Sequence, residues 1–191
     1  KLAAAEHGCQ VTVLCEEPRP AYDRVGLSGF FNGKTADDLS LVPEGFFDRS
    51  GIALHLSERA ESINRACRIV ITSSGRELAY DKLVLATGSY PFVPPIPGRE
   101  RKDCFVYRTI EDLIAIRDAS RNARTGVVIG GGLLGLEAAN GLMKRGMNVT
   151  VVHLLDTLME RQLDAVAGGL LRKSLEERGM VFKMPAQTEA R

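Results

Sequence analysis

A glycine-rich turn between an apolar run and a small-residue segment is the feature that most constrains this chain. Residues 125–129 form the apolar run, and Gly130, Gly132 and Gly135 follow it in G-x-G-x-x-G spacing. Between a buried strand and a helix, this motif is typical of a dinucleotide site. A second β-branched run, residues 148–153, lies where the next parallel strand of such a unit is expected. The sequence therefore predicts a dinucleotide-binding unit around this turn.

Each glycine has its own expected role. Gly130 permits the tight turn, Gly132 lets a pyrophosphate approach the backbone, and Gly135 lets the helix pack close to the strand. The helix N-terminus then offers free N–H groups and a positive dipole end to the phosphates. Together with Leu133 and Leu134, these glycines are our expected cofactor-binding residues here. The alternative is a glycine-rich strand–helix turn that binds no ligand.

Composition and charge exclude several classes of protein. The chain has 191 residues, of which 45% are hydrophobic and 26% charged, as in a soluble globular protein of one large or two small domains. A net charge of +1 gives no field that would favour nucleic acid or a membrane surface. No apolar run is long enough to span a bilayer, and no signal-peptide pattern is present. We expect a cytoplasmic protein with neither partner.

The four cysteines predict neither a metal site nor redox chemistry. They are Cys9, Cys15, Cys67 and Cys104, and none forms a C-x-x-C pair. Reduced thiols that fill space, with Cys15 buried, are the expected state.

The first residues resemble the second half of another dinucleotide unit. Residues 2–7 predict a helix end that stops at Gly8, and residues 11–15 predict a buried parallel strand. An acid at the tip of such a strand holds a ribose in dinucleotide folds, so Glu16 either binds ribose or is a solvated strand end. The glycine turn of this unit would precede Lys1. We therefore interpret the chain as a fragment.

Other elements follow from turn and capping residues. The loop at residues 19–28 binds a phosphate or ring, or is a polar surface loop. Prolines and glycine at residues 91–98 give the best domain boundary. Before this boundary we expect short helices at 35–39 and 45–50, a strand at 52–56, a hairpin at 68–80 and a buried strand at 83–88. After it we expect a short strand at 104–107, and a helix that a capping box at 109–112 opens and that runs to about 120. A further helix with Leu163, Val166, Leu170, Leu171 and Leu175 on one face and a strand at 180–184 complete the expected elements.

Several phrases together resemble a known family. They are residues 16–25 (EEPRPAYDRV), residues 80–91 (YDKLVLATGSYP), residues 104–113 (CFVYRTIEDL) and residues 130–139 (GGGLLGLEAA). The chain resembles the two-dinucleotide-domain flavoproteins of the pyridine nucleotide-disulfide oxidoreductase superfamily. Within that superfamily it is similar to the FAD/NAD(P)H portion of the large subunit of NAD(P)H-dependent nitrite reductase.

This resemblance implies an α/β fold with two Rossmann-like units and a small antiparallel β-meander. Residues 1–92 would be a partial FAD-binding domain without its glycine turn. Residues 93–191 would be an NAD(P)H-binding domain, truncated at its C-terminus. Hydride would pass from NAD(P)H to FAD, and electrons would pass on to iron–sulfur and sirohaem domains outside this chain, where nitrite becomes ammonia. A small subunit could join them, and an open sheet edge could pair two copies into a homodimer.

The resemblance also assigns residues to the cofactors, although none is expected to act as an essential acid or base. Glu137 would face the nicotinamide. The residues expected along FAD are Glu16, Arg24, Ser28, Ala60, Thr87 and Gly88.

Three departures from the family pattern matter. The FAD glycine turn is missing, no cysteine pair follows the first unit, and Gly29 stands where relatives that reduce ferredoxins or rubredoxins carry lysine. At the tip of the second strand of the NAD(P)H unit stands His153, which we count among the cofactor-binding residues. The nucleotide preference therefore stays open between NADH and NADPH, because an acid at this position would select NADH and an arginine would select NADPH. Alternatives are a stand-alone NAD(P)H:ferredoxin or rubredoxin reductase and a non-catalytic nucleotide-binding sensor.

Overall fold

The computed structural model describes residues 8–189, which pack into two units. The first unit comprises Lys1–Asp23 and Asp37–Gly88, and the second comprises Arg24–Ala36 and Ser89–Arg191. The helix end expected at residues 2–7 lies outside the described residues. The division into domains at residue 92 stays a prediction.

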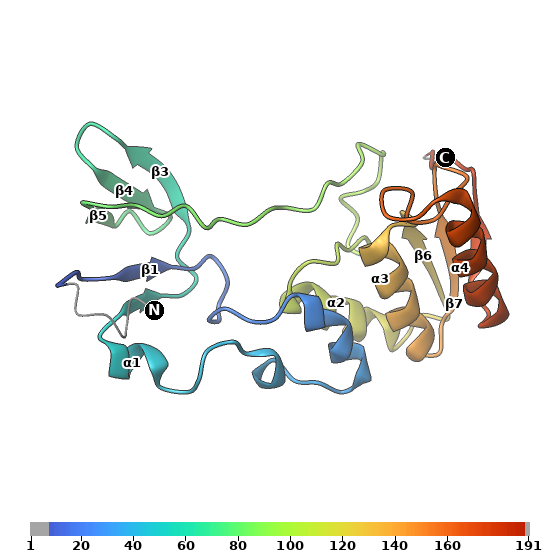
Figure 1. Ribbon diagram of the computed structural model, residues 1–191, viewed down its shortest axis with the longest axis horizontal. Coiled ribbons are helices and arrows are strands. Elements are labelled where there is room, and N and C mark those ends of the chain that lie inside the picture. Colours follow the sequence, from blue (N-terminus) through green and yellow to red (C-terminus); the bar gives the residue numbers. More distant parts are fainter. Residues whose placement is uncertain (1–7, 190–191) are drawn as a thin grey trace. The chain divides into compact units, whose positions relative to one another are not determined.

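The second unit is built on a parallel sheet of three strands in the order β6-β7-β8. The strands are β6 (Thr125–Ile129), β7 (Asn148–Val152) and β8 (Val181–Lys183), connected by α3 (Leu133–Lys144) and α4 (Ala165–Glu177). Ile129 is aligned with Val152, and Val152 with Lys183, so the three carboxyl ends meet at one edge. The expected strand–turn–helix around the glycines is confirmed (Figure 1).

Apolar side chains of α3 and β7 form the core of this unit. Val149 and Val151 are 1% and 0% exposed, as expected for β-branched residues of a central parallel strand. The small side chain of Ala139 is also fully buried, which lets α3 lie close against β6 and β7. Buried residues of the cluster are Leu136, Ala139, Met147, Val149, Val151, Leu158, Met180 and Phe182.

The predicted capping box is confirmed at the start of α2 (Ile110–Ser120). The Thr109 hydroxyl accepts from the Asp112 N–H (3.1 Å), and the Asp112 carboxylate accepts from the Thr109 N–H (2.8 Å). The 3-10 helix η2 (Val25–Asn32) packs against α2 and α3. Its Phe31 ring lies directly over Gly141 and stacks on Tyr107 with 6.4 Å between ring centroids.

The first unit contains two small sheets. The parallel pair is β1 (Thr12–Leu14) with β2 (Ala53–His55), and the antiparallel sheet is β3 (Ala60–Asn64), β4 (Ile69–Thr72) and β5 (Glu77–Ala79). The hairpin expected at 68–80 is therefore confirmed. The two short helices expected before β2 are present as the 3-10 turn η3 (Asp37–Leu39) and α1 (Phe46–Ser50).

Two expected strands are absent from the described chain. The apolar run at residues 83–88 is irregular, with Val84 82% and Leu85 68% exposed, and residues 104–107 are irregular as well. A buried strand needs hydrogen-bonded neighbours and a cover for its side chains. The described strands of each unit pair only with one another, so neither residues 83–88 nor residues 104–107 are paired in a sheet.

Burial was mispredicted in two further places. Val166 and Leu170 on α4 are 74% and 67% exposed, whereas Leu171 and Leu175 pack against the core. The buried Gly168 lies three residues before Leu171, so the inward face of α4 contains Gly168, Leu171 and Leu175 and excludes Val166 and Leu170. Leu163 precedes the helix, which begins after Asp164, and Cys15 is only half-buried.

Candidate dinucleotide site

The glycine turn connects β6 to α3 at the carboxyl edge of the parallel sheet. Gly130 has φ +115°, a left-handed conformation that L side chains rarely adopt, and its N–H donates to the Val152 carbonyl (2.8 Å). A Cβ at Gly135 would collide with the Gly130 carbonyl oxygen. The fold itself therefore requires glycine at both positions. As the sequence predicted, Gly130 permits the tight turn and Gly135 lets the helix pack close to the strand.

Gly132 differs from these two glycines. As the N-cap of α3 it has φ −81° and ψ 178°, which any residue adopts, and a Cβ built there meets no atom within 4 Å. Neither backbone strain nor crowding within the described chain calls for glycine. An open approach to bare backbone at a helix N-terminus is what an anionic diphosphate requires. The turn thus fits the group that the sequence implied.

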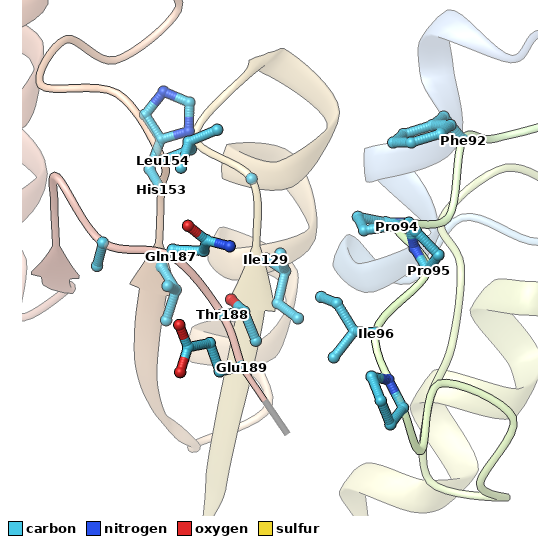
Figure 2. A pocket seen from close by; sticks show the side chains of 14 residues that line it. Phe92, Pro94, Pro95, Ile96, Ile129, His153, Leu154, Gln187, Thr188 and Glu189 are labelled. Atoms are coloured by element: carbon cyan, nitrogen blue, oxygen red, sulfur yellow. The ribbon is translucent and has the colours of Figure 1, made fainter. Parts of the chain in front are cut away.

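A cavity of about 710 Å³ opens at this edge of the sheet. Figure 2 shows Ile96 and Ile129 on opposite walls, with Thr188 and Glu189 beside the strand ends. The lining contains one carboxylate, from Glu189, and no lysine or arginine. The lining residues are Phe92, Pro94, Pro95, Ile96, Pro97, Ile129, Gly130, Val152, His153, Leu154, Ala186, Gln187, Thr188 and Glu189.

Two of these walls were not predicted from the sequence. Residues 92–97 were expected only as a connector, and residues 186–189 carried no expectation. Crevices outside the carboxyl ends of parallel strands are the usual ligand position in open α/β sheets. The cavity therefore lies where a dinucleotide fold places its ligand, beside the glycine turn.

His153 lies at the tip of β7, as expected, but its ring is turned toward the protein. Figure 2 shows the imidazole pointing away from Thr188 and Glu189. The Gly131 N–H donates to Nδ1 (3.1 Å), and Nε2 lies 3.1 Å from the Thr157 carbonyl oxygen. Both ring nitrogens therefore have partners within the protein. A contact between this ring and a ribose stays a prediction.

Glu137 and Tyr107 lie close enough to interact electrostatically. Burial raises the pKa of the Glu137 carboxyl above its ordinary value. The pKa of the Tyr107 phenol is also raised, first by burial and then by the Glu137 charge. Within residues 8–189 the buried Tyr107 hydroxyl oxygen has no hydrogen-bond partner. This part of the unit therefore favours an uncharged Glu137.

The variant Glu137→Gln should gain stability relative to wild type as the pH rises. When folding raises the pKa of a carboxyl, that carboxyl contributes to the free energy of unfolding, and the contribution is complete below the unfolded pKa. The contribution is lost as the pH rises through the folded pKa. Glutamine removes the titration. Urea unfolding at about pH 4 and about pH 7 should show a larger difference in favour of the variant at the higher pH. An equal difference at both would contradict the burial of this carboxyl.

The residues expected along FAD are divided between the two units. In the first unit, Glu16 forms an exposed ion pair with Arg59 (3.8 Å), Ala60 begins β3, and Thr87 and Gly88 lie in the irregular segment. In the second unit, Ser28 lies in η2, and the Arg24 guanidinium donates to the Arg108 carbonyl (3.0 Å). Their common flavin site stays a prediction.

The described residues contain neither a metal-binding cluster nor a membrane-spanning helix. No group of three or more histidine, cysteine, aspartate or glutamate side chains between residues 8 and 189 is placed to hold a metal ion. In the same range, no helix is both long and apolar enough to cross a bilayer.

The parallel sheet, the glycine turn and the cavity beside it define an α/β dinucleotide-binding protein. All 191 residues match the family model described as pyridine nucleotide-disulphide oxidoreductase, and the chain belongs to that family. The predicted α/β fold is confirmed by a solved relative, a NAD-dependent persulfide reductase from A. fulgidus. It superposes with a TM-score of 0.90 at 29% identity, over 96% of this chain and 36% of that one.

Curated relatives include large subunits of nitrite reductase. The chain is 52% identical over 170 residues to the nitrite reductase (NADH) large subunit of Escherichia coli (strain K12), covering 89% of this chain and 20% of that relative. It is 51% identical over 181 residues to the nitrite reductase [NAD(P)H] large subunit of Klebsiella oxytoca, covering 94% and 19%. The chain therefore spans about a fifth of the length of these relatives.

Proposed function

We propose that this chain is the NAD(P)H- and FAD-binding portion of a nitrite reductase large subunit. Its family membership and its identity of about one half to two such subunits support the assignment. The observation that carries the nucleotide-binding part of the proposal is Gly132, where glycine serves neither the backbone nor the packing of the described chain and leaves open the approach to the helix N-terminus. The chemistry belongs to the cofactors, and the protein positions them.

The expected residues other than His153 have the following roles in this proposal. The bare backbone at Gly132, with the N–H groups of Leu133 and Leu134, binds the diphosphate, while Gly130 and Gly135 hold the turn. Glu137 faces the nicotinamide. When bound, FAD would supply the hydride acceptor. The chain's FAD residues are Glu16, Arg24, Ser28, Ala60, Thr87 and Gly88.

NADH is the better fit to the cavity. The 2′-phosphate of NADPH adds negative charge and is usually held by arginine or lysine. The cavity lining has no such cation and contains the Glu189 carboxylate. We therefore propose NADH as the preferred nucleotide.

Electrons would continue to iron–sulfur and sirohaem domains elsewhere in the gene product, which reduce nitrite to ammonia. A small subunit and a homodimer are compatible with this arrangement. We also propose a cytoplasmic location, which suits the four free cysteines.

An anaerobic titration of the full-length gene product tests this function. We expect a yellow protein whose flavin absorbance bleaches with NADH, more readily than with NADPH, and recovers when nitrite is added. Recovery with rubredoxin or ferredoxin but not with nitrite would instead assign a stand-alone reductase. A protein that binds NADH without any flavin bleaching would be a sensor, and either result would overturn the proposal.

A further inference from the structure

The His153 imidazole joins the glycine turn to the loop that follows β7. Its Nδ1 accepts from the Gly131 N–H (3.1 Å), and its Nε2 lies 3.1 Å from the Thr157 carbonyl oxygen. The side chain is nearly buried, with His153 8% exposed. A third hydrogen bond joins the same two loops, because the Met159 N–H donates to the Gly131 carbonyl (3.0 Å). The Gly131 residue is therefore held through both its N–H and its C=O.

Packing fixes the same residue. A Cβ at Gly131 would lie 2.9 Å from the His153 ring carbon Cγ and 2.7 Å from a methyl carbon of Leu158, which is fully buried. The imidazole and Leu158 thus fill the space beneath the turn. Gly132, whose open backbone carries the proposed function, is the next residue. Its position depends on the peptide that His153 holds.

The hydrogen bonds define the protonation state of the ring. Since Nδ1 accepts from Gly131, the proton of the neutral imidazole is on Nε2 and is donated to the Thr157 carbonyl. A second proton on Nδ1 would turn this nitrogen into a donor that faces the Gly131 N–H, so the hydrogen bond between them would be lost. Only the neutral ring is compatible with this turn.

The charged groups nearest the ring are carboxylates of the loop after β7. The Glu160 carboxylate lies 3.4 Å from Nε2, whereas the ring points away from Glu189, which lines the adjoining cavity. Asp156 is one step away, accepting from the Thr157 hydroxyl (3.1 Å). From β8, the Lys183 backbone carbonyl accepts from the His153 N–H (3.0 Å).

We propose that His153 is a positioning residue for the nucleotide, acting through the glycine turn rather than by contact with the ribose. Its neutral imidazole holds the turn in the conformation that binds the diphosphate, and protonation releases the turn and weakens binding. This inference rests on the proposed function, because it assumes that a dinucleotide binds at this turn.

Two substitutions separate the hydrogen bond from simple packing. In His153→Asn, the side-chain carbonyl can take the place of Nδ1 and accept from Gly131. In His153→Leu, a side chain of similar bulk offers no acceptor. By calorimetric titration we expect His153→Leu to bind NAD⁺ about tenfold more weakly than wild type and His153→Asn to bind it within about threefold. Equal affinity of all three proteins would overturn the inference.

The pH dependence supplies a readout that packing would not change. Wild-type affinity for NAD⁺ should be several-fold lower at about pH 5 than at about pH 8, whereas His153→Asn should lose less affinity. Titration of Glu137 affects both proteins alike and cancels in the comparison. Matching pH profiles would contradict the role of His153.

The two proposals fail in different ways. A wild-type protein that binds no nicotinamide nucleotide at any pH would overturn the proposed function and this inference with it. Nucleotide binding that neither the leucine variant nor the pH affects would overturn only the role of His153. If His153→Leu does not fold, the comparison of the wild-type and asparagine pH profiles still decides.

Discussion

The variant Gly132→Val should fold like wild type and bind NADH about a hundredfold more weakly, a loss of about 2.7 kcal/mol of binding free energy. The backbone at this position has φ −81° and ψ 178°, which valine adopts readily. A Cβ there meets no atom within 4 Å, so the first carbon of the side chain has room in the free protein. The side chain would occupy the space through which the diphosphate reaches the helix N-terminus.

The chain offers a matched control for this substitution. Gly169 on α4 also has open space at its Cβ and no left-handed backbone. Gly169→Val should leave NADH affinity unchanged. A loss of affinity shared by both variants would indicate a general effect of valine on the fold and not a block at the turn.

The variant Gly135→Ala should show the opposite pattern, with the fold itself damaged. The added methyl group would collide with the Gly130 carbonyl oxygen, which is backbone and cannot move as a flexible side chain could. Overpacking of this kind costs about 1 to 3 kcal/mol, occasionally more, and we expect the upper part of that range in the free energy of unfolding. Urea unfolding measures this loss directly.

The control for Gly135→Ala is again on α4. Gly169→Ala adds the same methyl group to an open helical position, where alanine is favoured over glycine by about 1 kcal/mol. We expect it to raise stability slightly. Unchanged stability in Gly135→Ala would mean that α3 can move away from β6 without cost, which would contradict the close packing at this turn.

These two substitutions show how much the motif alone could predict. The spacing of the glycines assigned a turn, an approach and a close packing to Gly130, Gly132 and Gly135. The structure shows the positive φ at the first, the open space at the second and the crowding at the third. Such roles are predictable because they depend on local backbone geometry, which a short strand–turn–helix sequence determines.

The errors arose where distant partners decide the outcome. The apolar run at residues 83–88 has the composition of a buried strand, yet no described strand of its unit pairs with it and Val84 is 82% exposed. On α4, Leu170 fits a helical stripe, but the face that packs inward contains Leu171. Hydrophobic pattern gives the type of element and leaves open which neighbours cover it.

The orientation of the His153 ring could not be predicted from the sequence either. Its place at the tip of β7 followed from the spacing, but a ring turned toward the ribose and one turned toward Gly131 have the same sequence. The partners Thr157 and Glu160 lie four and seven residues further along the chain, in a loop without a motif. Only the tertiary structure could place them.

The most direct measurement is a calorimetric titration of NADH into wild type, Gly132→Val and Gly169→Val under identical conditions. We predict binding to wild type and Gly169→Val with equal affinity and about a hundredfold weaker binding to a folded Gly132→Val. Equal affinity in all three proteins would contradict the claim that the bare backbone at Gly132 receives the nucleotide diphosphate.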